Sequence, residues 1–203
     1  MENLGYYNGT VDLIENIRIP MTDRVCYFGD GVYDATYAHN HKIFDLKNHI
    51  DRFFNSAGLM RMDIGMSKEE VGALLEEMVK KVDAQTQFVY WQVTRGSEIR
   101  NHAWKDGIKG NLWIMIKPAS ITDLSQKIKV ISREDTRFLH CNVKTLNLLP
   151  SVLAAKEAEE AGCQECIFHR GDIVTECAHS NVSILKDGVL KTHPTDHLIL
   201  PGI

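Results

Sequence analysis

The segment Asn142-Val143-Lys144-Thr145-Leu146-Asn147 immediately precedes the one helix that the second half of the chain predicts. That helix is expected to begin near Leu149-Pro150, since proline is tolerated in a first turn, and to end at Gly162, because glycine commonly follows a helix. Short apolar runs then predict four strands, at residues 165–169, 173–175, 182–185 and 189–192. Considered alone, Lys144 is one of 23 lysines and arginines, and its ordinary interpretation is a surface lysine.

The half of the chain before this segment predicts strands, then two helices, then further strands. Asn8-Gly9 is typical of a type I′ turn in a β-hairpin, and the polar residues 39–41 indicate a second hairpin. Apolar residues at helical spacing predict a helix over residues 47–61. Ser67 and Glu70 form a capping-box pattern, which marks the start of a second helix. Two apolar strands are expected at residues 88–94 and 112–116.

The order of these elements predicts an α/β (α+β) chain with two domains, residues 1–117 and 122–203. Residues 118–125 are polar and irregular, and residues 118–121 are expected to be the linker between the domains. The second domain has a single helix to cover its strands. We therefore expect this domain to be C-terminally incomplete, with the missing part either in a natural chain that continues past Ile203 or supplied separately.

Composition excludes several classes of partner. The net charge is −4 with lysines and arginines dispersed, which argues against nucleic acid as a ligand. No apolar run reaches membrane-spanning length and no secretory signal is visible, so the expected location is the cytoplasm. The five cysteines are expected to be free thiols. Cys163-x-x-Cys166 lacks the second pair that a structural zinc site uses, and no metal site is predicted.

Five segments, in order and spacing, resemble the class IV (fold-type IV) pyridoxal-phosphate-dependent aminotransferases over nearly the whole chain. They are Asp23-Arg24 with Phe28-Gly29-Asp30-Gly31-Val32-Tyr33-Asp34, His49-Ile50-Asp51-Arg52, the Lys144 segment, Thr175-Glu176-Cys177-Ala178-His179-Ser180-Asn181-Val182, and Thr192-His193-Pro194 with Leu200-Pro201-Gly202-Ile203. Within this family, Arg95-Gly96 and Arg100-Asn101-His102 look most like the D-amino-acid (D-alanine) type.

The resemblance implies pyridoxal 5′-phosphate as the cofactor, held in the cleft between the two domains. It assigns Lys144 as the Schiff-base lysine, whose amine also moves a proton at the substrate α-carbon. It assigns Glu176 to the ring nitrogen, where a carboxylate stabilises the ring proton. Arg52 is expected to bind the phosphate through its guanidinium. The other expected cofactor-binding residues are Ser180, Asn181, Leu200, Gly202 and Ile203.

The resemblance also implies the substrates and the assembly. Tyr33 is expected near the substrate, and Arg100 with His102 is expected to bind the substrate carboxylate. The implied reaction exchanges an amino group between a D-amino acid such as D-alanine and a 2-oxo acid such as 2-oxoglutarate, in a homodimer. The sequence departs from the D-type pattern in two segments. Ala178-His179-Ser180 replaces a run of serines, and Ser183 replaces a common aromatic residue, which alters the substrate pocket and the cofactor hydrogen bonds.

Three alternatives remain open at this stage. A branched-chain L-amino-acid aminotransferase shares the same general pattern, although the Arg100-x-His102 pair favours the D-type. An aminodeoxychorismate lyase shares the lysine and the glutamate but eliminates pyruvate. A non-catalytic truncated fragment, which binds cofactor weakly or serves as a dimer partner, fits the abrupt ending at Ile203.

Overall fold

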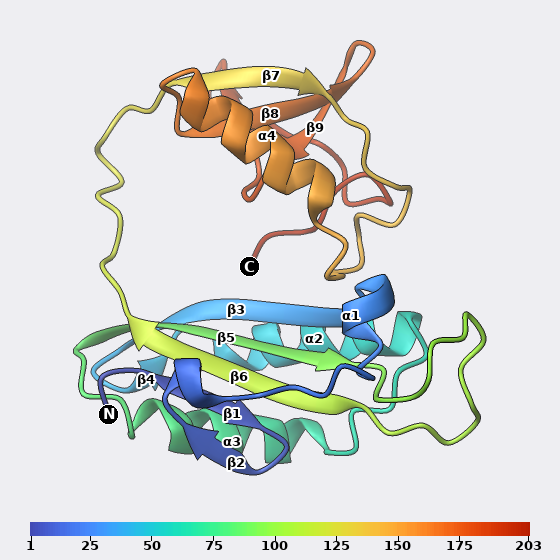
Figure 1. Ribbon diagram of the computed structural model, residues 1–203. Helices are drawn as coiled ribbons and strands as arrows, with labels where there is room; N and C mark the ends of the chain where they lie inside the picture. Colours follow the sequence, from blue (N-terminus) through green and yellow to red (C-terminus); the bar gives the residue numbers. More distant parts are fainter. The chain divides into compact units, whose positions relative to one another are not determined.

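A computed structural model describes residues 1–203 (Figure 1). In this structure the chain forms two compact units. The first unit contains Met1–Thr122, the three residues Lys144–Leu146, and Ile203. The second contains Asp123–Val143 and Asn147–Gly202. The contacts of Lys144 described below are therefore contacts inside the first unit.

The first unit is built on a six-stranded sheet with the order β2-β1-β6-β5-β3-β4, in which every neighbouring pair is antiparallel. Its strands are β1 (Leu4–Tyr7), β2 (Thr10–Asp12), β3 (Gly31–His39), β4 (Lys42–Ile43), β5 (Thr86–Thr94) and β6 (Asn111–Pro118). The two predicted hairpins are confirmed as β1–β2 and β3–β4. Asn8 and Gly9 have φ values of 45° and 95°, and a type I′ turn requires positive φ at both positions.

Helices α2 (Leu46–Leu59) and α3 (Lys68–Val79) pack apolar side chains against those of the sheet to form the first core. The ring of Phe53 on α2 lies 6.2 Å from that of Trp91 on β5, and both side chains are fully buried. Ser67 caps α3 through the predicted capping box with Glu70. Helix α2 ends before the predicted residue 61 because Arg61 adopts a φ of 56°, which a right-handed helix does not allow.

Residues 144–146 extend the sheet at the edge of β3. The amide of Tyr33 donates to the carbonyl of Lys144 (2.9 Å), and the amide of Leu146 donates to the carbonyl of Gly31 (3.0 Å). Val32 and Thr145 face each other in this antiparallel bridge. At Gly31 a Cβ atom would lie 2.5 Å from Leu146 Cδ1 and 2.8 Å from the carbonyl oxygen of Val93, so glycine permits this close approach.

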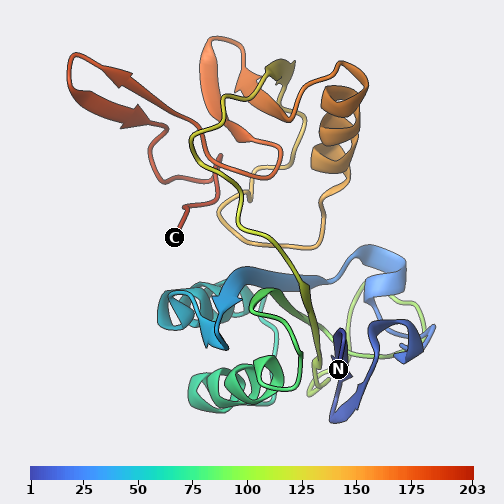
Figure 2. The ribbon, with the colours of Figure 1, turned by 90° about the vertical axis from the view of Figure 1, so that its left-hand side faces the viewer.

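The second unit contains a three-stranded sheet with the order β7-β8-β9 and a separate hairpin. Its elements are β7 (Val130–Glu134), α4 (Leu149–Glu160), β8 (Glu165–Arg170), β9 (Ile173–Cys177), β10 (Ser183–Lys186) and β11 (Val189–Thr192). Strands β7 and β8 are parallel, and α4 is the connection between them. Its core joins small residues of α4 to Cys166 and Phe168 on β8. Figure 2 shows the β10–β11 hairpin extending away from the three-stranded sheet.

Two short helices have no counterpart in the sequence-based expectations, namely η1 (Ile14–Asn16) and α1 (Val25–Phe28). Both are too short to show an apolar periodicity. Helix α1 ends at Gly29, whose φ of 59° is left-handed. This short helix fixes the place of Arg24 and Phe28, which both bear on the site. No helix in the structure is long and apolar enough to cross a membrane.

Candidate active site

Lys144 and Tyr33 meet on one face of the first sheet. The ammonium nitrogen of Lys144 lies 4.3 Å from the centre of the Tyr33 ring. The same ring stacks on Tyr90 of β5, with centroids 5.3 Å apart and planes inclined by 23°. The hydroxyl of Tyr90 donates to Gln92 Oε1 at 2.7 Å. Lys144 therefore lies over a stacked pair of tyrosine rings, Tyr33 and Tyr90, on this face of the sheet.

The same face carries buried donors without a hydrogen-bond partner in the protein. They are Gln92 Nε2 and Trp113 Nε1. Tyr33 pairs with Gln92 across β3 and β5, and Gln92 pairs with Trp113 across β5 and β6. Directly opposed residues of a sheet point to the same side, so these donors share the face of Tyr33. Because a buried donor without an acceptor is costly, this face fits a polar ligand.

Arg52 is held by a buried carboxylate on the helix-covered face. Its Nε donates to Asp34 Oδ2 at 2.8 Å and its Nη2 donates to Asp34 Oδ1 at 2.7 Å. His49 Nδ1 lies 2.8 Å from Asp34 Oδ1. Burial raises the pKa of Asp34, but the hydrogen bonds from Arg52 and His49 outweigh it, and the pKa lies below its usual 3.8. The bidentate pair fixes the guanidinium plane of Arg52.

Arg100 and His102 lie against the same aromatic ring. The guanidinium carbon of Arg100 is 5.1 Å from the centre of the Phe28 ring, and the His102 ring is 5.1 Å from it. Both residues are exposed. The structure thus brings together the two residues predicted to bind a substrate carboxylate. No pattern in the sequence indicated that Phe28 lies beside both of them.

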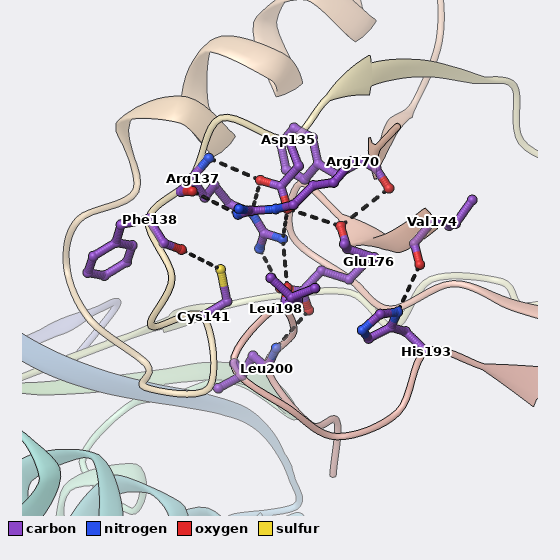
Figure 3. Close-up of polar contacts among 12 residues, drawn as sticks. Asp135, Arg137, Phe138, Cys141, Arg170, Val174, Glu176, His193, Leu198 and Leu200 are labelled. Atoms are coloured by element: carbon purple, nitrogen blue, oxygen red, sulfur yellow. Dashed lines mark hydrogen bonds and ion pairs between the residues drawn. The ribbon is translucent and has the colours of Figure 1, made fainter. Parts of the chain in front are cut away.

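Glu176 is the centre of the predicted cofactor residues in the second unit (Figure 3). Its carboxylate forms an ion pair with Arg137 and accepts hydrogen bonds from Asn181 Nδ2 (3.1 Å) and the amide of Leu200 (3.0 Å). Burial raises the pKa of Glu176, and the hydrogen bond and charge of Arg137 oppose this rise without cancelling it. A mostly buried carboxylate with a cationic partner suits a protonated ring nitrogen.

A second carboxylate holds Arg137 in place. Asp135 Oδ2 accepts from Arg137 Nη2 at 2.9 Å and from Arg170 Nε at 3.2 Å (Figure 3). Burial raises the pKa of Asp135, but its hydrogen bonds with Arg137 outweigh burial and leave the pKa below its usual range. Sequence reasoning missed both residues. The only signal is an acidic and a basic residue two positions apart in a polar loop, which many loops contain.

The other predicted cofactor-binding residues of the second unit contact two different carboxylates. Asn181 and Leu200 donate to Glu176, whereas Ser180 donates to Glu165. Asn181 also donates to the carbonyl of Leu200 at 2.9 Å. A Cβ atom on Gly202 would lie 2.8 Å from Asn181 Oδ1, so glycine allows this turn to close on Asn181. The hydroxyl of Ser180, in contrast, donates to Glu165 Oε2 at 2.7 Å. Ile203, assigned to the first unit, is 46% exposed.

Comparison with known proteins decides the family. The sequence model of the family described as amino-transferase class IV matches residues 31–203. The chain belongs to the class IV aminotransferases. This class IV aminotransferase is 43% identical over 194 residues to a D-alanine aminotransferase of Listeria monocytogenes serotype 4b, which covers 93% of this chain and 67% of that protein. It is 38% identical over 201 residues to a D-alanine aminotransferase of Staphylococcus epidermidis strain RP62A, covering 98% and 71% respectively.

The solved structures agree on the fold. A branched-chain aminotransferase of the archaeon Thermoproteus uzoniensis, solved with norvaline, superposes with a TM-score of 0.87 at 22% identity, covering 98% of this chain and 71% of that one. The predicted mixed α/β fold of fold type IV is thereby confirmed. Members of this class use pyridoxal phosphate, and another branched-chain member of similar fold was solved with pyridoxamine 5′-phosphate. This class IV aminotransferase is therefore a pyridoxal-phosphate-dependent transaminase. The chain spans about two thirds of the length of these relatives.

Proposed function

We propose that this transaminase exchanges an amino group between a D-amino acid, such as D-alanine, and a 2-oxo acid, such as 2-oxoglutarate. The observation that carries the proposal is the placement of Arg100 and His102 on the ring of Phe28, in a chain 43% identical to a D-alanine aminotransferase. A fixed guanidinium fork suits a carboxylate, which amino acids and oxo acids share.

The residues proposed to hold the cofactor are those that the family resemblance assigns, and the contacts within each unit support these assignments. When bound, the pyridoxal ring supplies an electron sink for the carbanion at the substrate α-carbon. Lys144 is proposed to attach the cofactor covalently and, once released, to carry the proton to and from that carbon. Glu176 is proposed to stabilise a proton on the ring nitrogen. The contact with Arg137 favours the ionised form of the Glu176 carboxylate, which this role needs.

The phosphate would be held by a cation and by backbone donors. Arg52 is proposed as the cation, with its plane fixed by Asp34. The amides at Gly202 and Ile203 are proposed as further donors, since glycine allows a phosphate to approach the backbone. Asn181 and Leu200 order this turn through their mutual hydrogen bond and their contacts with Glu176. Ser180 is proposed as a further cofactor-binding residue, and its hydroxyl is oriented by its hydrogen bond to Glu165.

The substrate would lie on the face of the first sheet that carries Tyr33. The phenol ring of Tyr33 positions the amine of Lys144 from one side, at 4.3 Å. Arg100 and His102 are proposed to bind the substrate carboxylate, and this contact would orient the adjacent α-carbon. The half-reactions with the amino acid and with the oxo acid use the same contacts, because both substrates carry this carboxylate.

Assembly, domain limits and location are part of the same proposal. We take the chain to have two domains, residues 1–117 and 122–203 joined by 118–121, and to act as a homodimer in the cytoplasm. The basis for the dimer is the family resemblance. Light scattering of the purified protein tests it, and a mass equal to a single chain at assay concentrations would contradict it.

An amino-donor screen tests the function. The protein loaded with pyridoxal phosphate is assayed with D-alanine and with L-leucine, each with 2-oxoglutarate as acceptor. Turnover of D-alanine in clear preference to L-leucine is expected. Preference for L-leucine would establish the branched-chain alternative, and pyruvate release from aminodeoxychorismate without an acceptor would establish the lyase. Cofactor binding without turnover of any donor would indicate a non-catalytic protein.

A further inference from the structure

Arg24 is a buried cation that precedes α1 and lies among four polar groups. Its side chain is 3% exposed. The Nε atom donates to Asp30 Oδ2 at 2.7 Å, and Nη1 donates to Glu98 Oε1 at 2.6 Å. The guanidinium also reaches the backbone, donating to the carbonyls of Asn101 (2.6 Å) and His102 (3.1 Å). All of these groups belong to the first unit.

Three of these four partners belong to a single loop, residues 98–102. The amide of Glu98 also donates to the carbonyl of Thr22 (2.9 Å), so the start of the loop is hydrogen-bonded to the backbone two residues before Arg24 as well. The loop carries the side chains of Arg100 and His102, which both lie against Phe28. The guanidinium carbon of Arg24 is itself 4.9 Å from the centre of that ring. One buried side chain therefore contacts the backbone of the loop and the ring on which its functional side chains rest.

Arg95 provides a matched comparison. It shares the carboxylate of Asp30 with Arg24, donating from Nε at 2.9 Å, and its side chain is comparably buried at 7% exposed. Its other donors go to the carbonyls of Met60 and Arg61, after the end of α2, and its guanidinium stacks 3.8 Å from the Trp104 ring. Arg95 thus shares the carboxylate partner of Arg24, but its guanidinium donates to the segment after α2 instead of to residues 98–102.

We propose that Arg24 is a positioning residue for recognition of the substrate carboxylate. This inference rests on the proposed function of Arg100 and His102. By holding the carbonyls of Asn101 and His102 and the carboxylate of Glu98, Arg24 sets where the two recognition side chains stand before substrate arrives. The rigid fork of arginine reaches these acceptors and Asp30 at once, whereas the point charge of lysine cannot span them. A shift of the loop by about 1 Å is enough to cost roughly a hundredfold in a well-oriented reaction.

The test compares Arg24→Lys with Arg95→Lys in the cofactor-loaded protein. Arg24→Lys is expected to raise the KM for both D-alanine and 2-oxoglutarate about ten- to hundredfold, to retain the cofactor, and to speed amide hydrogen exchange in residues 98–102. Arg95→Lys is expected to lower the melting temperature while leaving both KM values and this exchange near wild type. A wild-type KM for both substrates in Arg24→Lys would overturn the proposal, whatever the hydrogen exchange of the loop shows.

A double-mutant cycle separates positioning from a general loss of structure. If Arg24 acts through the loop, Arg24→Lys adds little to the KM of the double variant Arg100→Ala, His102→Ala, because both side chains that it positions are already gone. Fully additive effects on KM would contradict the proposal. Should Arg24→Lys fail to fold, Glu98→Gln decides, since it weakens the same loop contact and leaves the Arg24–Asp30 pair intact. Unchanged KM and exchange in Glu98→Gln would then overturn it.

The experiment also distinguishes this inference from the function on which it rests. If the wild-type protein does not use D-alanine, the proposed function fails, and hydrogen exchange of residues 98–102 still reports whether Arg24 holds the loop. Faster exchange in Arg24→Lys would then support the structural half of the inference, and unchanged exchange would reject it. If wild type uses D-alanine and Arg24→Lys leaves KM unchanged, the inference alone fails.

Discussion

The backbone and the side chain of Lys144 both contact Tyr33. The carbonyl of Lys144 accepts the amide of Tyr33 at 2.9 Å, and its ammonium nitrogen lies 4.3 Å from the centre of the Tyr33 ring. A cation over an aromatic face is stabilised by the ring's electron distribution. The position of this amine is therefore set by a strand that lies far away in the sequence.

The first prediction concerns this amine. Borohydride reduction of the cofactor-loaded protein should fix the cofactor on Lys144, which peptide mass analysis detects. Lys144→Ala should abolish transamination, since the variant loses both the covalent attachment and the proton carrier. Lys156→Ala is the control, because that lysine makes an exposed ion pair with Glu159 on α4. Labelling of a different lysine would refute the assignment.

The second prediction concerns the carboxylate proposed for the ring nitrogen. Glu176→Gln keeps the shape of the side chain but removes its charge. The cofactor should still bind, while proton transfer at the substrate α-carbon slows by orders of magnitude, because a neutral amide does not stabilise a ring proton. Stopped-flow measurement of the half-reaction with D-alanine, with a deuterated substrate for comparison, reports this step. Turnover near that of wild type would remove Glu176 from this role.

The third prediction uses the Arg137 contact to shift a pH profile. Burial raises the pKa of Glu176, and Arg137 opposes part of this rise through a hydrogen bond and through charge. In Arg137→Met burial acts without that opposition, so the pKa rises further. Activity that needs the ionised carboxylate should then be lost at higher pH than in wild type. The acidic limb of kcat against pH measures this shift. Arg137→Lys should move the limb less, and an unmoved limb in Arg137→Met would contradict the coupling.

The fourth prediction concerns stability and Asp34. Because its pKa in the folded protein lies below the usual 3.8, the ionised carboxylate stabilises the fold above that pH. This contribution is lost as the pH falls through the folded-state pKa. Asp34→Asn breaks a buried pair with Arg52 and His49, and should lower the unfolding free energy by roughly 3–5 kcal/mol at pH 7. Denaturant unfolding between pH 7 and pH 3 should show this deficit shrinking below about pH 3.8.

Asp51 supplies the control for that measurement. It also pairs with two cations, Lys47 and Lys68, and their hydrogen bonds lower its pKa to about 2, but the pairs are exposed on the surface. Surface ion pairs contribute little to stability. Asp51→Asn should therefore change the unfolding free energy far less than Asp34→Asn at pH 7. Equal effects of the two substitutions would show that burial of the Asp34 pair is not the source of its contribution.

Local patterns were sufficient for most of the elements. The Ser67–Glu70 capping box and the Asn8-Gly9 turn are short-range chemistry, and the structure contains both. Helix α1 was missed because four residues cannot show a period. The pairing of residues 144–146 with β3 was missed for a different reason. It joins segments that are distant in the sequence, and three residues carry no alternation that identifies a partner strand.

The site residues, like the secondary-structure elements, differ in how far the sequence could predict them. Lys144 and Glu176 were assigned by resemblance, since a single lysine or glutamate carries no local signal of its own. The ion pairs Arg52–Asp34 and Arg137–Glu176 were not foreseen, because each joins residues from separate elements. A charged residue in a sequence can form an ion pair, but the sequence does not identify its partner. Only the fold determines which carboxylate it meets, and hence the direction in which a pKa moves.

The bridge between residues 144–146 and β3 has a consequence for insertions and deletions. Side chains alternate between the two faces of a sheet, and Lys144 shares the face of Tyr33, whereas Asp34 and Trp91 point to the helix-covered side. A slip of one residue in this bridge would carry the amine to the opposite face. A substitution before Lys144 leaves this register unchanged, whereas the loss or gain of one residue that shifted it would separate the amine of Lys144 from Tyr33.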